Sequence, residues 1–184
     1  MKKILFIACL TWGALSCNND SKDPKTPASS DKIAPAADGK LDMPYTLPRP
    51  YQNWTTGDLK HAQTVMKSLK AFETGDLATC LDAFADSADI RMDGFHEKMS
   101  HDSLKHMFTG LRASYKSLKI EMGDYESVIN SDKNEEWVTL WYKETWVDSK
   151  GKADSLNVVD DARMVNGKIA VLDEKQQRYP PAKK

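Results

Sequence analysis

The pair Asn166-Gly167, which lies between two runs of strand-forming residues, most limits what this chain can fold into. Asn-Gly readily adopts φ > 0 at both central positions, as a two-residue type I′ hairpin turn requires. Such a turn sets the register of the strands that it joins, and it predicts that Asp160 faces Asp173. The residues expected on their common face are Leu156, Val158, Asp160, Ala162, Met164, Ile169, Val171 and Asp173. This apolar surface with two carboxylates predicts the wall of a pocket.

A second turn is predicted at Asp148-Ser-Lys-Gly151. If Ser149 and Lys150 are its central residues, Thr139 faces Asp160, and Trp141 and Lys143 join the same side of the sheet. The pocket predicted from the two hairpins contains Asp160, Asp173, Thr139, Trp141, Lys143 and Val158. The opposite side of the sheet then exposes an apolar patch of the kind that contacts a partner, and it contains Leu140, Tyr142, Trp146 and Leu172.

The half of the chain before these hairpins predicts three helices. Apolar residues at spacings of three and four form a stripe from Leu59 to Phe72, and Gly75 ends it. Asp76 begins a second, short helix that includes Phe84, and Ser100 caps a third.

Strands are expected over residues 88–92, 118–122, 125–129, 137–147, 156–165 and 169–177, with Gly123 as a candidate bulge. Helices that precede a run of strands indicate the α+β class. We expect a cone-shaped, curved antiparallel sheet that three N-terminal helices close.

The first residues, MKKILFIACLTWGALSC, predict an export signal. A basic start is followed by an apolar run of about a dozen residues, which is too short to span a bilayer. Ala-Leu-Ser-Cys17 resembles a bacterial lipobox, which implies cleavage before Cys17 and lipid attachment to it; an ordinary secretory signal is the alternative. The acidic, Asn-rich residues that follow resemble lipoproteins of the Bacteroidota. The expected location is therefore the cell envelope, lipid-anchored to the outer membrane on its periplasmic or outer side.

We divide the chain accordingly. The expected segments are a signal peptide over 1–16, a lipid-anchored linker with a strap of prolines and aromatic residues over 17–54, a folded domain over 55–179 and a tail over 180–184.

Composition excludes several classes of partner and chemistry. The 26 basic and 27 acidic side chains give no electrostatic case for binding nucleic acid. No metal site is predicted, because none of the four histidines pairs with another at a spacing of four residues. No cofactor is expected either, since the chain has no Gly-rich phosphate loop. Cys80 is interpreted as a small buried hydrophobic residue.

Two segments indicate a family. Residues 71–90, AFETGDLATCLDAFADSADI, resemble the opening of nuclear transport factor 2-like domains, including the SnoaL-like group. Asp160-x-x-Arg163-x-x-Asn166-Gly-Lys-Ile169 resembles the last hairpin of that group. The resemblance covers roughly Thr56 to Arg178 and implies a cystatin-like α+β barrel that forms a sheet-to-sheet homodimer. It does not identify a function, because one fold serves many.

The resemblance also implies roles for single positions. Asp160 matches an acid/base aspartate of SnoaL-like cyclases, and it is the candidate catalytic residue. In ketosteroid isomerases the oxyanion tyrosine corresponds to Ser68 and the general-base aspartate to Met92. Both departures argue against steroid isomerase chemistry, and Met92 is instead expected to line the pocket.

Three functions remain open from the sequence. The first is a lipid-anchored envelope protein that binds a small, partly apolar ligand of unknown identity without turnover. The second is an acid/base enzyme of the isomerase, dehydratase or cyclase type that uses Asp160. The third is an envelope protein-interaction module.

Overall fold

The computed structural model describes residues 44–46, 53–130, 132 and 135–178. The predicted signal peptide, Cys17 and the tail over 180–184 lie outside these residues, as does most of the predicted linker. Within the described part of the chain, no helix is both long and apolar enough to cross a bilayer. The folded domain belongs to the compact unit from Leu47 to Lys184.

Three helices form where the sequence predicts them. The bounds are α1 Leu59–Thr74, α2 Leu77–Asp82 and α3 His101–Ala113. Asp58, Asp76 and Ser100 accept backbone N–H bonds at the three N-termini, which satisfies donors that a helix leaves free. Gly75 ends α1 with φ 87°, a value that glycine adopts without steric cost.

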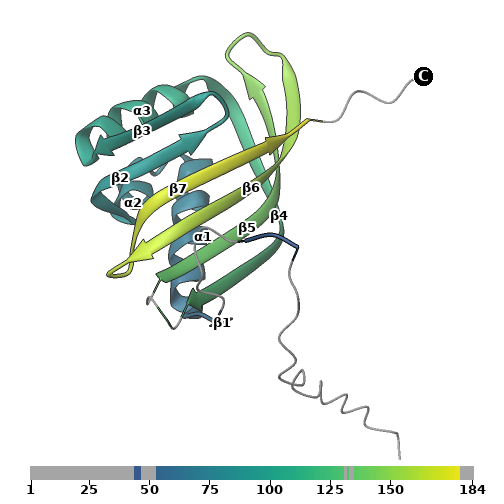
Figure 1. Ribbon diagram of the computed structural model, residues 1–184. Helices are drawn as coiled ribbons and strands as arrows, with labels where there is room; N and C mark the ends of the chain where they lie inside the picture. Colours follow the sequence, from purple (N-terminus) through teal and green to yellow (C-terminus); the bar gives the residue numbers. More distant parts are fainter. Residues whose placement is uncertain (1–43, 47–52, 131, 133–134, 179–184) are drawn as a thin grey trace, which may run out of the picture. The chain divides into compact units, whose positions relative to one another are not determined.

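Seven strands form one curved sheet in the order β1-β4-β5-β6-β7-β2-β3 (Figure 1). All neighbours are antiparallel except β2 and β7, which are parallel. The helices cover its concave side, and the buried core lies between them and the sheet. The bounds are β1 Trp54–Thr56, β2 Phe84–Met92, β3 Phe95–Ser100, β4 Tyr115–Asn130, β5 Glu135–Asp148, β6 Ala153–Val165 and β7 Lys168–Gln177. The predicted α+β class and curved sheet are confirmed.

Local differences from the predicted elements are small. Phe84 begins β2 rather than ending the second helix, and β1 and β3 were not predicted. Strand β4 is continuous, and its register against β5 shifts between Met122 and Asp124. The predicted bulge at Gly123 is therefore confirmed. A Cβ atom at Gly123 would lie 3.1 Å from the carbonyl oxygen of Trp141, so the close approach of the strands favours glycine there.

The predicted register of β5 against β6 is wrong by one residue. The turn includes Gly151 at φ 84°, and Val147 pairs with Ala153. This turn is one residue longer than a turn centred on Ser149 and Lys150, so Leu140 rather than Thr139 lies opposite Asp160. A shift of one residue exchanges the two faces of a strand.

The predicted register of β6 against β7 is also wrong beyond the first two pairs. Asn166 and Gly167 take φ 51° and 75°, so the type I′ turn forms as predicted. Met164 pairs with Ile169, but Arg163 pairs with Val171, which leaves one extra residue in β7. As a result, Asp160 faces Glu174, and Asp173 faces Asp161.

These two shifts overturn the predicted dimer face. Leu140, Tyr142 and Leu172 are 0%, 5% and 8% exposed and belong to the core beneath the helices. Trp146 packs against the same core. The four residues therefore cannot form an exposed contact surface on the folded domain. Apolar residues do alternate along β5, but the register predicted from the turn placed each set of alternate residues on the wrong face of the sheet.

We expect Gly57→Ala to destabilise the fold by about 1–3 kcal/mol. Gly57 joins β1 to α1, and its N–H donates to the Ser127 carbonyl over 2.8 Å. A Cβ atom there would lie 2.7 Å from the Ser127 hydroxyl oxygen and 3.0 Å from the Val128 backbone. Gly110→Ala is the control. It lies within α3 with nothing inside 4 Å of its Cβ position, so it should stabilise by about 0.5–1 kcal/mol. Urea unfolding of both variants checks the pair.

Candidate functional site

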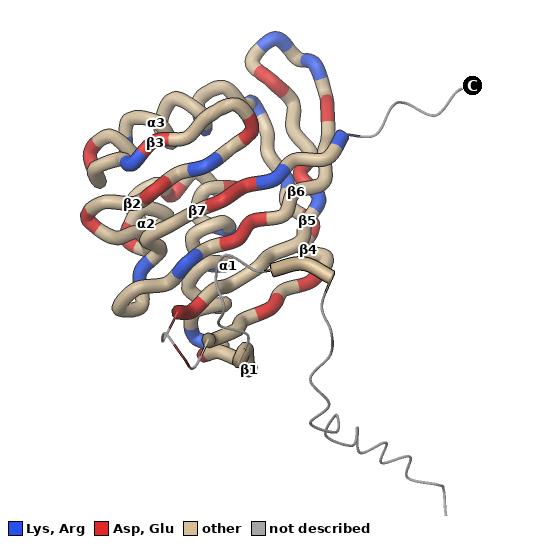
Figure 2. Tube along the Cα trace, viewed as in Figure 1, with Lys and Arg blue, Asp and Glu red and all other residues tan. Residues whose placement is uncertain are grey.

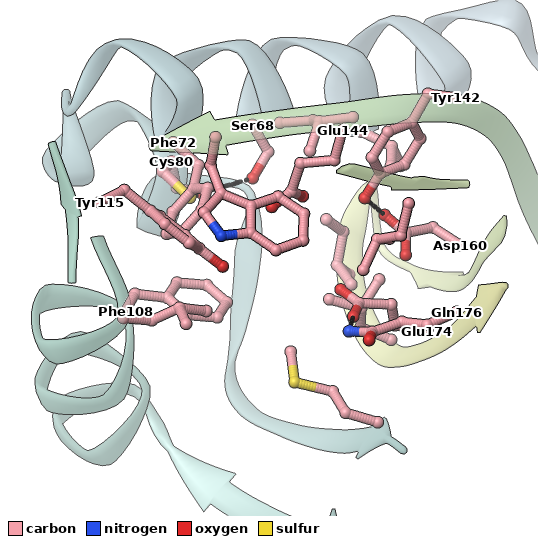
Figure 3. A pocket seen from close by; sticks show the side chains of 18 of the residues that line it. Ser68, Phe72, Cys80, Phe108, Tyr115, Tyr142, Glu144, Asp160, Glu174 and Gln176 are labelled. Carbon is pink, nitrogen blue, oxygen red and sulfur yellow. Dashed lines mark hydrogen bonds between the residues drawn. The ribbon is translucent and has the colours of Figure 1, made fainter. Parts of the chain in front are cut away.

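A pocket opens between the concave face of the sheet and the helices. Its volume is about 190 Å³. Figure 3 shows Tyr115 and Phe108 on one side of the pocket and Asp160, Glu174 and Gln176 on the other. Most of the lining is apolar, and three carboxylates interrupt it. The lining residues used below are Ser68, Phe72, Cys80, Met92, Phe108, Tyr115, Tyr142, Glu144, Trp146, Asp160, Leu172, Glu174, Gln176 and Arg178.

Asp160 is the most deeply buried of the three carboxylates. Strand β6 places it between Leu140 on β5 and Glu174 on β7, and only 5% of its surface is exposed. The Tyr142 hydroxyl donates to its Oδ2 over 3.0 Å. Its other oxygen, Oδ1, is buried and accepts no hydrogen bond from the described residues. A buried acceptor without a partner is costly, which makes Oδ1 the atom most in need of a donor from a ligand or a water.

Two glutamates share the pocket with Asp160. Glu174 accepts a hydrogen bond from the Gln176 side chain over 2.7 Å. Glu144 lies further along β5, two residues beyond Tyr142, and its carboxylate interacts with the Tyr115 hydroxyl. These contacts hold the carboxylates on one surface, where each disfavours the ionisation of its neighbours.

All three carboxyl groups hold protons more tightly than usual. Burial raises the pKa of Asp160 well above its ordinary value, and the Glu174 charge adds to this, while the Tyr142 hydrogen bond acts in the opposite direction. Burial likewise raises the pKa of Glu174. For Glu144, burial and the Glu174 charge raise the pKa to about 7. The pocket can therefore take up and release protons near neutral pH, as general acids and bases do.

Aromatic rings form the opposite wall. Phe108 packs edge-to-face against Phe72 and Phe84, with ring centroids 5.7 Å and 5.4 Å away. The ring centroids of Tyr115 and Trp146 lie 6.0 Å apart. The Arg178 guanidinium lies 5.5 Å from the centroid of the Trp146 ring. The site thus offers an apolar ligand a rigid aromatic surface, with Phe108 and Tyr115 on the side away from Asp160 and Glu174.

The predicted pocket residues fall on both sides of the sheet. Asp160 and Met92 line the pocket, and Val158 faces the same side in the core, where it is 2% exposed. Thr139, Trp141, Lys143 and Asp173 lie on the outer face instead, because of the two register shifts. Figure 2 shows that both signs of charge occur along β2, β6 and β7.

On that outer face, polar partners replace the predicted pocket contacts. The Thr139 hydroxyl donates to Asp161 over 2.7 Å, and Lys175 bridges Asp161 and Asp173 at 2.8 Å and 3.2 Å. Trp141 is 38% exposed. The predicted pairing of Asp160 with Asp173 is therefore wrong, and Glu174 takes the place of Asp173.

Sequence reasoning missed Glu144 and Glu174 entirely. Each lies one residue from a position that was assigned to the pocket: the error in the β5–β6 register displaced Glu144, and the error in the β6–β7 register displaced Glu174. The apolar alternation on β5, with Val138, Leu140 and Tyr142 on one side, carried the correct signal. The register derived from the predicted turn contradicted this alternation, and that register was wrong.

Two of the positions compared with ketosteroid isomerases line the pocket. The Ser68 hydroxyl donates to the Cys80 carbonyl over 2.8 Å, so its proton is already engaged. Cys80 is buried with a free thiol, and burial raises the pKa of that thiol. Met92 brings no polar group. Among the described residues, no group of three or more potential ligands could hold a metal ion.

No protein-family profile and no curated protein sequence matches this chain. Solved structures do. One is a nuclear transport factor 2-like protein of unknown function from Burkholderia pseudomallei, with a TM-score of 0.54, 18% identity and coverage of 64% of this chain and 91% of that one. The fold is that of nuclear transport factor 2-like proteins.

Two further structures with the nuclear transport factor 2-like fold have informative descriptions. TerC, co-crystallised with polyporic acid, has a TM-score of 0.54 and 13% identity over 64% of this chain and 92% of that one. An LEH-like epoxide hydrolase of M. tuberculosis has a TM-score of 0.54 and 11% identity over 65% of this chain and 84% of its own. At these identities the similarity establishes the nuclear transport factor 2-like fold alone.

Proposed function

We propose that this domain binds a small, partly apolar molecule in the pocket between its helices and its sheet. The observation that carries this proposal is Oδ1 of Asp160, a buried acceptor that has no partner among the described residues and lies in a largely apolar cavity. A cavity of about 150 Å³ can enclose a benzene molecule, so about 190 Å³ suits a ligand of about one ring. The co-crystal of TerC with polyporic acid supports the same use of the fold.

Acid/base turnover is the second candidate, and Asp160 beside Glu174 favours it. Two adjacent carboxyl groups that share a proton give one group able to donate and one able to accept. The epoxide hydrolase among the structural neighbours supports a catalytic use of the fold. The substrate class would then be a small molecule whose isomerisation, dehydration or cyclisation needs one proton added and one removed.

Asp160→Asn and Asp161→Asn form a matched pair that tests both candidates. Asp160 faces the pocket, whereas Asp161 faces outward and bonds Thr139 and Lys175. We expect Asp160→Asn to weaken the binding of a co-purified ligand by roughly tenfold or more, because one carboxyl oxygen is replaced by an amide nitrogen that cannot accept a hydrogen bond. Asp161→Asn should leave binding within twofold.

Native mass spectrometry of the purified chain identifies the ligand, and calorimetry measures its affinity for each variant. Turnover of the ligand by the wild type but not by Asp160→Asn would favour the enzyme. An empty pocket in every preparation, with no affinity for small molecules, would contradict both candidates and leave the interaction module.

The proposed location is the cell envelope, with the protein lipid-anchored to the outer membrane through Cys17. The support is the order of a basic start, an apolar run and Ala-Leu-Ser-Cys at the N-terminus. We expect Cys17→Ala to abolish the incorporation of labelled palmitate and to release the protein from membranes. Unchanged labelling of the variant would contradict the anchor.

The homodimer implied by the family resemblance remains part of the proposal, but its contact must differ from the one first predicted. The outer face of the sheet, where Trp141 is 38% exposed, is the surface that supports it. Sedimentation of the wild-type chain as a monomer at tens of micromolar would contradict it.

A further inference from the structure

We propose that the ligand of this pocket is an amine with a single-ring or branched apolar body. It binds as the ammonium ion, with its nitrogen beside Asp160 and Glu174. This inference rests on the function proposed above and names the chemical class of the ligand. It follows from three features of the pocket: its charges, its unpartnered acceptor and its aromatic wall.

Among the described residues, no unengaged cation faces the carboxyl groups of the pocket. Glu144, Asp160 and Glu174 all line it, whereas Arg178 is the only described lining residue with a permanent positive charge. Arg178 is engaged elsewhere, since its Nη1 donates to Asp154 over 3.0 Å and its guanidinium lies against the Trp146 ring. Lys175, on the neighbouring strand position, bonds Asp161 and Asp173 on the outer face. A cationic ligand would supply the missing charge, whereas an anion would be repelled.

Oδ1 of Asp160 needs a donor, and an ammonium group has up to three. Asp160 is 5% exposed and Oδ1 has no hydrogen-bond partner among the described residues. Asp160 and Glu174 are directly paired across β6 and β7. A single ammonium nitrogen between them can donate to Oδ1 and to Glu174 together. Hydrogen bonds between ions of opposite charge are about twice as strong as neutral ones.

The aromatic wall suits the rest of such a ligand. Phe72, Phe108 and Tyr115 lie on the side of the pocket away from Asp160 and Glu174 (Figure 3), and Trp146 also lines it. Their rings can pack against an apolar body, and their faces attract a positive charge. The cavity of about 190 Å³ limits that body to roughly one ring.

Amine binding must expel protons from this pocket, which separates it from the binding of a neutral molecule. The titratable and charged groups that face the carboxylates are Cys80 from α2, Tyr115 from β4, Tyr142 and Glu144 from β5, Asp160 from β6, and Glu174 and Arg178 from β7 and its end. Burial raises the pKa of Asp160 and that of Glu174, and it raises the pKa of Glu144 to about 7. A cation replaces a proton, so its affinity should rise with pH until the amine itself loses its charge.

The test compares benzylamine with benzyl alcohol, which have the same ring and nearly the same size. We measure both by isothermal titration calorimetry on the purified full chain at pH 6 and pH 8. We expect benzylamine to bind at least tenfold more tightly than benzyl alcohol at pH 8. Its affinity should rise from pH 6 to pH 8, because the raised pKa values of Asp160 and Glu174 let protons compete with the ammonium ion at the lower pH. Binding of benzylamine should release protons from the pocket. Titrations in buffers of different ionisation enthalpy will measure the number released per bound benzylamine.

Variants locate the ammonium group. Asp160→Asn and Glu174→Gln should each reduce the affinity for benzylamine about tenfold and leave that for benzyl alcohol within twofold. Asp161→Asn, on the outer face, should change neither. Equal or tighter binding of benzyl alcohol at both pH values would overturn the amine and leave the proposed ligand-binding function standing. If neither compound binds and native mass spectrometry finds an empty pocket, both the inference and the proposed function fail.

Discussion

Leu140→Asp should prevent the domain from folding, whereas Trp141→Asp, the next residue along β5, should be tolerated. Leu140 is 0% exposed and lies directly opposite Asp160. Replacing it removes a buried side chain, which costs about 2–5 kcal/mol, and adds a carboxyl group beside one that already lacks a counterion. The sum approaches or exceeds the roughly 5–15 kcal/mol that stabilises a domain of this kind.

Trp141 points to the other side of the same strand and is 38% exposed. Its replacement should cost no more than about 2 kcal/mol, because its new carboxylate remains hydrated. Circular dichroism and urea unfolding of the two purified variants compare them directly. A folded Leu140→Asp protein beside an unfolded Trp141→Asp protein would mean that the register of β5 is the one first predicted from the turn.

Glu144→Gln should stabilise the domain above pH 7 and have little effect at pH 4. Burial first, and then the Glu174 charge, raise the pKa of Glu144 from 4.5 to about 7 in the folded state. Stability from the protonated carboxyl group is therefore complete below pH 4.5 and is lost as pH rises through about 7. Each pKa unit corresponds to about 1.4 kcal/mol, so the loss amounts to about 3–4 kcal/mol. Glutamine cannot ionise, so the variant does not lose this stability as the pH rises.

Glu121→Gln is the control for this pH dependence. Glu121 is exposed on β4, and its hydrogen bond with Lys119 lowers its pKa. Its replacement should not raise stability at any pH. Free energies of unfolding from urea titrations at pH 4, 6 and 8 give the difference between each variant and the wild type. A Glu144→Gln protein that gains no stability between pH 4 and pH 8 would show that Glu144 ionises freely in the folded state.

The sequence predicts the elements of this fold well because each depends on local chemistry. Caps at Asp76 and Ser100, the stop at Gly75 and the turn at Asn166-Gly167 all involve contacts within a few residues. The periodicity of apolar residues then assigns helices and strands. These signals were sufficient for the α+β class and for placing Asp160 beneath the helices.

The register of the strands depends on longer contacts, and there the sequence was insufficient. Gly151 lengthens one turn by a residue, and β7 carries one more residue than a regular hairpin needs. Each change moves a whole strand onto its other face, so single-residue errors exchanged Thr139 for Leu140 and Asp173 for Glu174. On β7 the alternation of apolar and polar residues could not distinguish the regular register from the bulged one, because Val171 and Leu172 are both apolar.

The extra residue in β7 also has a consequence for the order of folding. The regular and bulged registers share the Asn166-Gly167 turn and the pairs next to it, so the hairpin can form before either is chosen. In the bulged register, Leu172 lies beside Ile90 and Asp173 beside Arg91 in the parallel pairing with β2. We therefore expect the register to be selected late, when β2 docks from the other half of the domain. A segment from outside the hairpin thus determines which of two neighbouring acids enters the pocket.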